Sequence, residues 1–157
     1  MELRRRGALT DHSFGRAYLN FLDEEGISPD GLIEAAAYEP AHQSGPDAGW
    51  ICRHLRDTHD LWHKATGYKG DVVGEASLLA FTLAQTGNPG LGLIALGAAH
   101  TLDETEYRRL IMDGFRRGLV ARWFVSVDWV GRLELPLDEV RRRLRLDDPP
   151  NYVPLRE

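Results

Sequence analysis

Apolar side chains recur at helical spacing along most of the chain, and Gly, Pro and Asn separate the segments that carry them. The first such run lies between Ser13 and Gly26 and contains four large apolar residues: Phe14, Tyr18, Phe21 and Leu22. Serine is a preferred amino-terminal cap and glycine a common helix end, so a helix is predicted between them. Residues 31–37 are expected to form a short helix, and residues 38–49 a loop rich in Gly and Pro.

Two longer helices are predicted to follow one another closely. The first is expected to run over about 49–66, with Asp47 as its cap and Gly67 as its stop. Asp71 is expected to cap the second, which continues to residue 86. Only a few residues would then join the end of one helix to the start of the next.

The second half of the chain also reads as mainly helical. Residues 91–100 predict a short apolar helix, and residues 101–104 show the capping-box pattern that would start another. Residues 119–130 combine β-branched and aromatic side chains with helical neighbours, so strand and helix both stay open there. Asp138 is expected to cap a final helix.

Length and composition indicate one domain. The chain has 157 residues, of which 43% are hydrophobic, and this is enough for one core. It shows neither an internal repeat nor a linker. We therefore expect a single compact all-α domain over residues 1–157, with a helical core at about 13–146 and an extended, proline-containing tail at 147–157.

Charge and cysteine content exclude several classes of protein. The net charge of −5 argues against nucleic-acid binding. Cys52 is the only cysteine, so no disulfide can form within the chain. The weakly charged run at 76–100 is broken by Gly and Pro at 87–90, and neither half is long enough to span a bilayer. The amino terminus has arginines but no apolar core, and reads as neither a secretion signal nor a transit peptide.

Two histidines lie four residues apart in the predicted helix at 49–66, in the sequence His59-Asp60-Leu61-Trp62-His63. At about 100° per residue, both imidazoles fall at the edge of the inward face, and Asp60 lies farther round toward solvent. The inward face itself is marked by Ile51, Leu55, Trp62 and Thr66. Paired helical metal ligands project together in this way. A surface pair or a buried core pair of histidines fits the same spacing, so a third ligand is needed to distinguish a metal site from these alternatives.

Glu75 is the candidate third ligand. It opens the next predicted helix, on the shoulder of an apolar face made by Val72, Ala76, Leu79, Ala80 and Leu83. A carboxylate there is costly to bury unless it is paired or bound to a metal. The alternative is a first-turn glutamate that the helix dipole stabilises.

The motif as a whole resembles that of a known family. His59, Asp60 and His63, followed after eleven residues by Glu75 with Gly74 before it, match the H-D-x-x-H-x11-E pattern of the Coq4 family of ubiquinone (coenzyme Q) biosynthesis proteins. The likeness extends from about Ser13 to Leu146, and three further segments carry it: residues 15–32, 79–98 and 127–146.

This resemblance implies a helical fold with the motif on two consecutive helices, peripheral membrane attachment and a divalent metal ion, zinc in the usual assignment. The ligand positions of the family's motif fall on His59, Asp60, His63 and Glu75, and catalytic roles on Asp60 and Glu75. The implied reaction removes the C1 carboxylate from a polyprenylated 4-hydroxybenzoate-type ring, with hydroxylation at the same carbon. Other ubiquinone biosynthesis proteins are the implied partners.

The chain is shorter than eukaryotic members of the family and shows no transit peptide, so it resembles a bacterial member on the cytoplasmic side of the inner membrane. Oligomeric state stays open, and homo-oligomers are compatible with the sequence.

Several alternatives remain at this level. Asp60 points about 100° away from its neighbour His59, so it either ligates the metal, holds an imidazole or moves a proton. The chain could instead be a non-catalytic lipid-binding scaffold in which the metal is structural. A phosphohydrolase built on the His-Asp doublet would need more ligands, and those available are His100, Asp103, Asp113 and Asp128.

Two surfaces are candidates for contact with lipid. Small residues keep the predicted helix at 91–100 slim, which suits close helix packing or an isoprenoid chain: Gly90, Gly92, Gly97, Ala98 and Ala99. Aromatic residues with nearby arginines suit either a membrane surface or the core: Trp123, Phe124 and Trp129, with Arg116, Arg117 and Arg122. The arginine clusters at 4–6, 116–117 and 141–145 are interpreted as solvated helix faces or ends.

Overall fold

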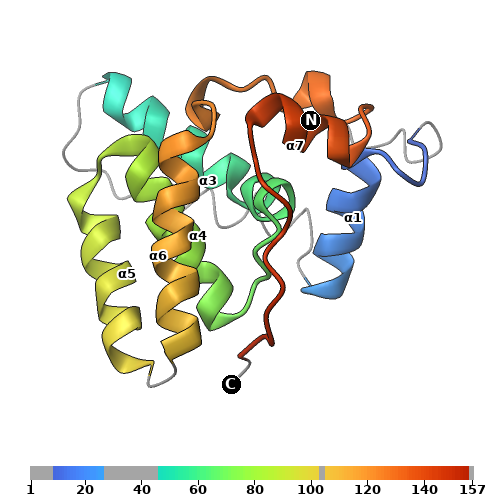
Figure 1. The fold of residues 1–157 in the computed structure, drawn as a ribbon. Coiled ribbons are helices and arrows are strands. Elements are labelled where there is room, and N and C mark those ends of the chain that lie inside the picture. The colour runs from blue at the N-terminus through green and yellow to red at the C-terminus, as the bar shows by residue number, and fades with distance from the viewer. Residues whose placement is uncertain (1–8, 27–45, 103–104, 156–157) are drawn as a thin grey trace.

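The computed structural model describes residues 9–26, 46–102 and 105–155, with side chains from residue 54 onward in the second range (Figure 1). These residues form six α-helices: α1 (Phe14–Glu24), α3 (Pro46–Thr66), α4 (Val72–Thr86), α5 (Pro89–Thr101), α6 (Thr105–Val120) and α7 (Leu137–Leu144). Two 3-10 helices, η1 (Phe124–Ser126) and η2 (Val130–Arg132), precede α7. Because the described residues contain no strand, the all-α expectation is confirmed. The predicted helix at 31–37 and most of the loop after it fall outside the described ranges.

Several helix ends are set by the residues that the sequence indicates. The Ser13 side chain accepts a hydrogen bond from the backbone N–H of Arg16 at the start of α1, and Asp71 does the same for Val73 at the start of α4. Gly67 follows α3 with a φ of 87°, in the left-handed region that glycine adopts without strain. The caps of α1 and α4 and the stop of α3 are therefore confirmed.

Three other predicted helix starts are wrong. Helix α3 begins at Pro46, so Asp47 lies inside it; proline suits a first helical position because its missing N–H would have no partner there. Thr101 ends α5, and its hydroxyl donates to the carbonyl of Ala98 at 3.0 Å instead of capping the next helix. Asp138 lies in the first turn of α7, where the helix dipole favours its charge, and not at the cap.

The ambiguous segment at 119–130 contains no strand: its first two residues end α6, and the remainder leaves that helix. It folds into η1 and a turn over the core, where Phe124 and Trp129 are buried with ring centroids 5.3 Å apart. Burial of these large rings stabilises the folded state more than their exposure would. Of the two interpretations that the sequence left open, the core is therefore confirmed for Phe124, Trp129 and the buried Arg117; Trp123 alone of the three aromatic residues is exposed.

Helices α4, α5 and α6 stand side by side, while α1 and α7 lie on the other side of the molecule (Figure 1). The closest helix pair is α4 with α6, where Gly114 lies against the carbonyl of Ser77 and Gly118 against that of Phe81. On α5 the expected close packing of small residues occurs at Gly92, which lies against Leu83, whereas Gly97 faces open space.

The tail at 147–155 has no regular structure, as its prolines predict. It runs beside the segment that joins α3 to α4 (Figure 1) and contributes the buried ring of Tyr152 to the core. Helix α1 thus packs against α3, and the tail packs against the α3–α4 connection and the first turn of α4. Within the described ranges, every helix is too short or too polar to cross a membrane.

Candidate metal centre

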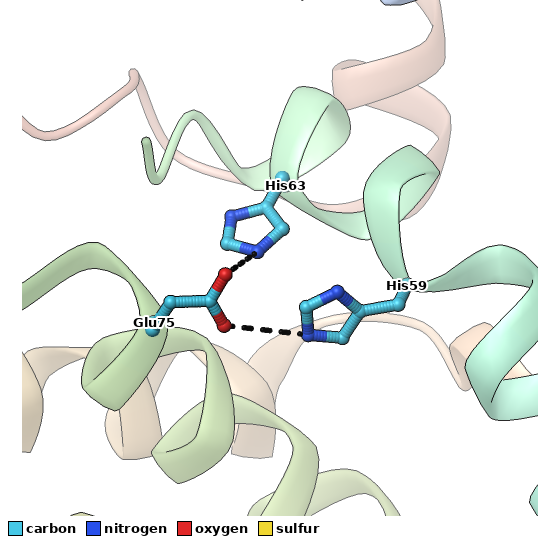
Figure 2. Close-up of side chains that lie close together, drawn as sticks. All are labelled: His59, His63 and Glu75. Atoms are coloured by element: carbon cyan, nitrogen blue, oxygen red, sulfur yellow. Dashed lines mark ion pairs between the residues drawn. The ribbon is translucent and has the colours of Figure 1, made fainter. Parts of the chain in front are cut away.

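Three side chains of the motif converge where α3 gives way to α4 (Figure 2). His59 and His63 project from the last two turns of α3, and Glu75 from the first turn of α4. One ligand atom from each lies within 4.8 Å of the others, and this is the one such group of three among the described residues. The local cause is the short connection, because five residues from Gly67 to Asp71 keep the two helix ends together.

The Glu75 carboxylate lies between the two imidazoles (Figure 2). Its Oε1 is 3.0 Å from Nε2 of His63, and its Oε2 is 3.6 Å from Nε2 of His59. Two ligand atoms bound at about 2.0–2.1 Å to one tetrahedral zinc ion are about 3.3 Å apart. Both nitrogen–oxygen separations are close to that value, and ligand atoms of all three residues lie within 4.8 Å of one another, so the side chains would have to draw closer to share an ion.

The three ligands lie at different depths. The side chain of His63 is 1% exposed and its ring stacks on Phe21, with centroids 5.5 Å apart. The side chains of His59 and Glu75 are 37% and 43% exposed. The centre therefore has a buried inner wall at His63 and opens to solvent on the side of the other two residues.

The two ring nitrogens of His63 face different neighbours. Its Nδ1 lies 3.2 Å from the carbonyl oxygen of Tyr68, a distance at which Nδ1–H donates to that oxygen. Nε2 is buried 3.0 Å from Oε1 of Glu75, with no hydrogen bond of good geometry. A neutral Nε2 and a carboxylate at that distance would repel each other, and either a proton on Nε2 or a bound cation supplies the positive charge between them.

The electrostatics of the centre also favour positive charge. Burial lowers the pKa of His59, but its bond to Asp60 and the charges of Glu75 and Asp60 outweigh burial, and the net pKa is raised. Burial raises the pKa of Glu75, but its contact with His63 and the charges of both histidines outweigh burial, and the net pKa is lowered. Glu75 is therefore held as a carboxylate.

The sequence as a whole matches a family model. The model of Coenzyme Q (ubiquinone) biosynthesis protein Coq4 covers residues 1–150. The chain belongs to the Coq4 family. The resemblance carried by the motif and its flanks is confirmed.

Individual Coq4 proteins are similar over nearly the whole chain. The mitochondrial ubiquinone biosynthesis protein COQ4 of Scheffersomyces stipitis is 30% identical over 161 residues, which cover 100% of this chain and 49% of the relative. The Pyrenophora tritici-repentis protein is 32% identical, with 100% and 54% covered, and the Danio rerio homolog 31%, with 96% and 55% covered. The chain spans about half the length of these relatives.

A crystal structure from Nostoc punctiforme PCC 73102, of a candidate ubiquinone biosynthesis protein, shares the fold. Its TM-score is 0.63 at 24% identity, over 87% of this chain and 63% of that one.

Asp60, the fourth motif residue, does not join the group of three in this Coq4-family chain. Its Oδ1 lies 3.6 Å from Nδ1 of His59, on the opposite edge of the ring from Glu75. The expectation that Asp60 faces solvent is wrong, since its side chain is only 14% exposed. Helix α1 covers this side of α3, and burial together with the charge of Asp60 raises the pKa of Tyr18 to about 12. The position of Asp60 suits a residue that orients His59.

Two arginines from the clusters at 116–117 and 141–145 hold the end of α3. Arg117 on α6 donates to the carbonyl of Thr66 at 2.9 Å, and Arg141 on α7 donates to that of Ala65 at 3.0 Å. Terminal carbonyls of a helix lack partners within the helix, and a cation there also interacts favourably with the dipole. The expectation that these arginine clusters lie on solvated faces is therefore wrong for Arg117, which is buried, and for Arg141 in part.

Among the described residues, the further ligands that a phosphohydrolase would need do not join this group. His100, Asp113 and Asp128 are described and lie outside the group of three. Asp113 pairs with Arg116 at 2.8 Å, and Asp128 accepts a hydrogen bond from the backbone of Gly131. Asp103 falls outside the described residues.

Proposed function

We propose that this chain is a metal-dependent enzyme of ubiquinone biosynthesis, with zinc as the ion. It removes the C1 carboxylate of a polyprenylated 4-hydroxybenzoate-type precursor at a membrane surface. One observation carries the metal assignment: ligand atoms of His59, His63 and Glu75 converge within 4.8 Å of one another, with His63 buried behind them. Membership of the Coq4 family supports the pathway.

The donor set fits such an ion. Two imidazoles and one carboxylate are the protein ligands of many catalytic zinc sites, which keep a further position for water or substrate. His59, His63 and Glu75 would hold the ion, and it would stabilise the negative charge that develops on the ring as carbon dioxide leaves.

Each residue of the centre has a distinct task in this proposal. His63 is the rigid inner anchor, because Phe21 and the carbonyl of Tyr68 fix its ring. Asp60 holds His59 with Nε2 toward Glu75. The substrate carboxylate enters from the outward side, where His59 and Glu75 are partly exposed. In a decarboxylation without hydroxylation, water on that side supplies the proton that takes the place of the carboxylate at C1.

Helix α5 supports a site of action at a lipid surface. Its outward residues Leu93, Ile94 and Leu96 are between 58% and 72% exposed, and the helix contains no Asp, Glu, Lys or Arg. Contiguous exposed apolar residues of this kind mark contacts with membranes or other proteins. The same face favours a second candidate function, a lipid-binding scaffold for other enzymes of the pathway.

Quinone analysis separates the two functions. In a ubiquinone-producing bacterial strain that depends on this chain, Glu75→Ala is expected to fold, to reach the membrane and to accumulate an intermediate that keeps the C1 carboxylate. Exposed His100→Ala, a histidine outside the centre, is the matched control and should restore the quinone. Mass spectrometry of the lipid extract also shows whether C1 ends with hydrogen or hydroxyl.

A normal quinone yield in the Glu75→Ala strain, with the variant protein free of metal, would favour the scaffold. Normal quinone content after deletion of the gene would exclude the pathway altogether.

A further inference from the structure

One buried tyrosine of the tail is bonded to the segment between α3 and α4. Tyr152 Oη accepts a hydrogen bond from the backbone N–H of Lys69 at 2.9 Å and donates one to Oδ1 of Asp71 at 2.7 Å. The other oxygen of Asp71 accepts from the N–H of Leu155 at 3.0 Å, and the N–H of Val72 donates to the carbonyl of Leu155 at 3.3 Å. The tail thus crosses the connection between the two ligand-bearing helices.

The first of these bonds reaches His63 through a single peptide group. The N–H of Lys69 and the carbonyl of Tyr68 belong to the same peptide unit, which is planar and rigid. Tyr152 holds its N–H end, and the carbonyl end lies 3.2 Å from Nδ1 of His63. Any tilt of this unit therefore moves the group that orients the buried imidazole.

The second bond reaches Glu75 through the cap of α4. Oδ2 of Asp71 accepts from the N–H of Val73 at 3.2 Å, and the backbone carbonyl of Asp71 accepts from the N–H of Glu75 at 2.8 Å. Gly74 adds a close contact, because a Cβ there would lie 2.5 Å from Oη of Tyr152. The first turn of α4, and Glu75 with it, is fixed against the tail.

We propose that Tyr152 and Asp71 are positioning residues of the metal centre, which set the relative placement of His63 and Glu75 across the α3–α4 connection. The inference rests on the proposed metal site and extends it to the tail. Tyr152 and Leu155 lie beyond the 150 residues that the family model matches. Residues that orient metal ligands directly change affinity by about 10- to 100-fold, and Tyr152 acts one bond farther out, so we expect about tenfold.

Three substitutions test this role. Tyr152→Phe keeps the buried ring and removes both hydrogen bonds of Oη. Asp71→Ser keeps a good helix cap but lacks the second oxygen that holds the tail. Thr82→Val is the matched control. It removes a buried hydroxyl from helix α4, where Thr82 Oγ1 donates to the carbonyl of Leu78.

Each purified full-length variant is titrated with Zn²⁺ in competition with a chromophoric chelator, and with Co²⁺, whose absorption spectrum depends on coordination geometry. Tyr152→Phe and Asp71→Ser should each bind both ions about tenfold more weakly than wild type and alter the Co²⁺ spectrum. The double variant should lose less affinity than the product of the two single losses, because both changes remove the Tyr152–Asp71 hydrogen bond. Thr82→Val should keep wild-type affinity and spectrum.

If wild type binds the ions and both Tyr152→Phe and Asp71→Ser match it in affinity and spectrum, the positioning role is wrong while the metal site stands. If affinity falls equally in Thr82→Val, the effect is one of general stability and the inference fails. If wild type itself binds neither ion, the proposed metal site is wrong, and the role of the tail falls with it.

Discussion

Substitution of Gly118 by alanine should destabilise this Coq4-family protein, although alanine is the better helix former. A Cβ on Gly118 would lie 2.6 Å from the carbonyl oxygen of Phe81 and 2.8 Å from Cβ of Ala84, whereas ordinary contacts begin at 3.4 Å. Helix α6 would have to withdraw from α4 by about 0.8 Å to restore normal contact. That movement also stretches the 2.7 Å hydrogen bond from Gln85 Nε2 to the carbonyl of Gly118.

The expected magnitude follows from three contributions. Overpacking costs about 1–3 kcal/mol, and the weakened hydrogen bond about 1 kcal/mol. Replacing glycine by alanine inside a helix returns about 1 kcal/mol. The net loss is about 1–3 kcal/mol, which lowers Tm by between about 2 and 12 °C in a protein of this length.

Gly97→Ala on α5 is the control, because no atom lies within 4 Å of a Cβ at that position. It should gain the helix-forming advantage alone and raise the free energy of unfolding by about 0.5–1 kcal/mol. Scanning calorimetry and chemical denaturation of the two variants should therefore give shifts of opposite sign. Equal or reversed shifts would refute the inference that α4 and α6 are in backbone contact at Gly118.

Three further outcomes are expected. Zn²⁺ at 100 times its Kd should stabilise wild type by about 2.7 kcal/mol; calorimetry with and without chelator should show this shift in His100→Ala but not in His63→Ala. Burial and the Asp60 charge raise the folded-state pKa of Tyr18 from 10.0 to about 12. Because the unfolded chain ionises first, the contribution of Tyr18 to the free energy of unfolding is present below pH 10 and is lost as pH rises toward 12. Tyr18→Phe should therefore lose less stability than wild type over that interval, as denaturant unfolding would show, and an equal loss would contradict the linkage. Combined Leu93→Asp and Ile94→Asp should reduce flotation with anionic vesicles without lowering helix content; unchanged flotation would exclude α5 as the lipid contact.

The sequence alone was sufficient to predict much of the centre. His59 and His63 share a face because residues four apart do so on any α-helix. Gly67 and Asp71 mark the end of one helix and the start of the next, and the short connection between them brings Glu75 near the histidines. These are local regularities, which depend on residues within one or two turns of each other.

Local signals were weaker where two neighbouring residues compete for one role. Asp47, Thr101 and Asp138 each have the chemistry of a helix cap, yet the helices begin or end elsewhere. The predicted and observed helix ends differ by a few residues at each site, because a nearby proline can start a helix, or a nearby carbonyl can accept the side chain's hydrogen bond, about as well as the predicted cap.

Only the tertiary structure decided which distant residues support the centre. Tyr152 and Asp71 are 81 residues apart, Arg141 and Ala65 are 76 apart, and both contacts are hydrogen bonds that fix the ends of the helices carrying the ligands. Asp60 looked solvent-facing on its own helix and is covered by α1. A periodic pattern identifies which face of a helix is apolar, but the partner that covers a polar residue or accepts its hydrogen bond depends on how separate helices pack, and no local regularity specifies that.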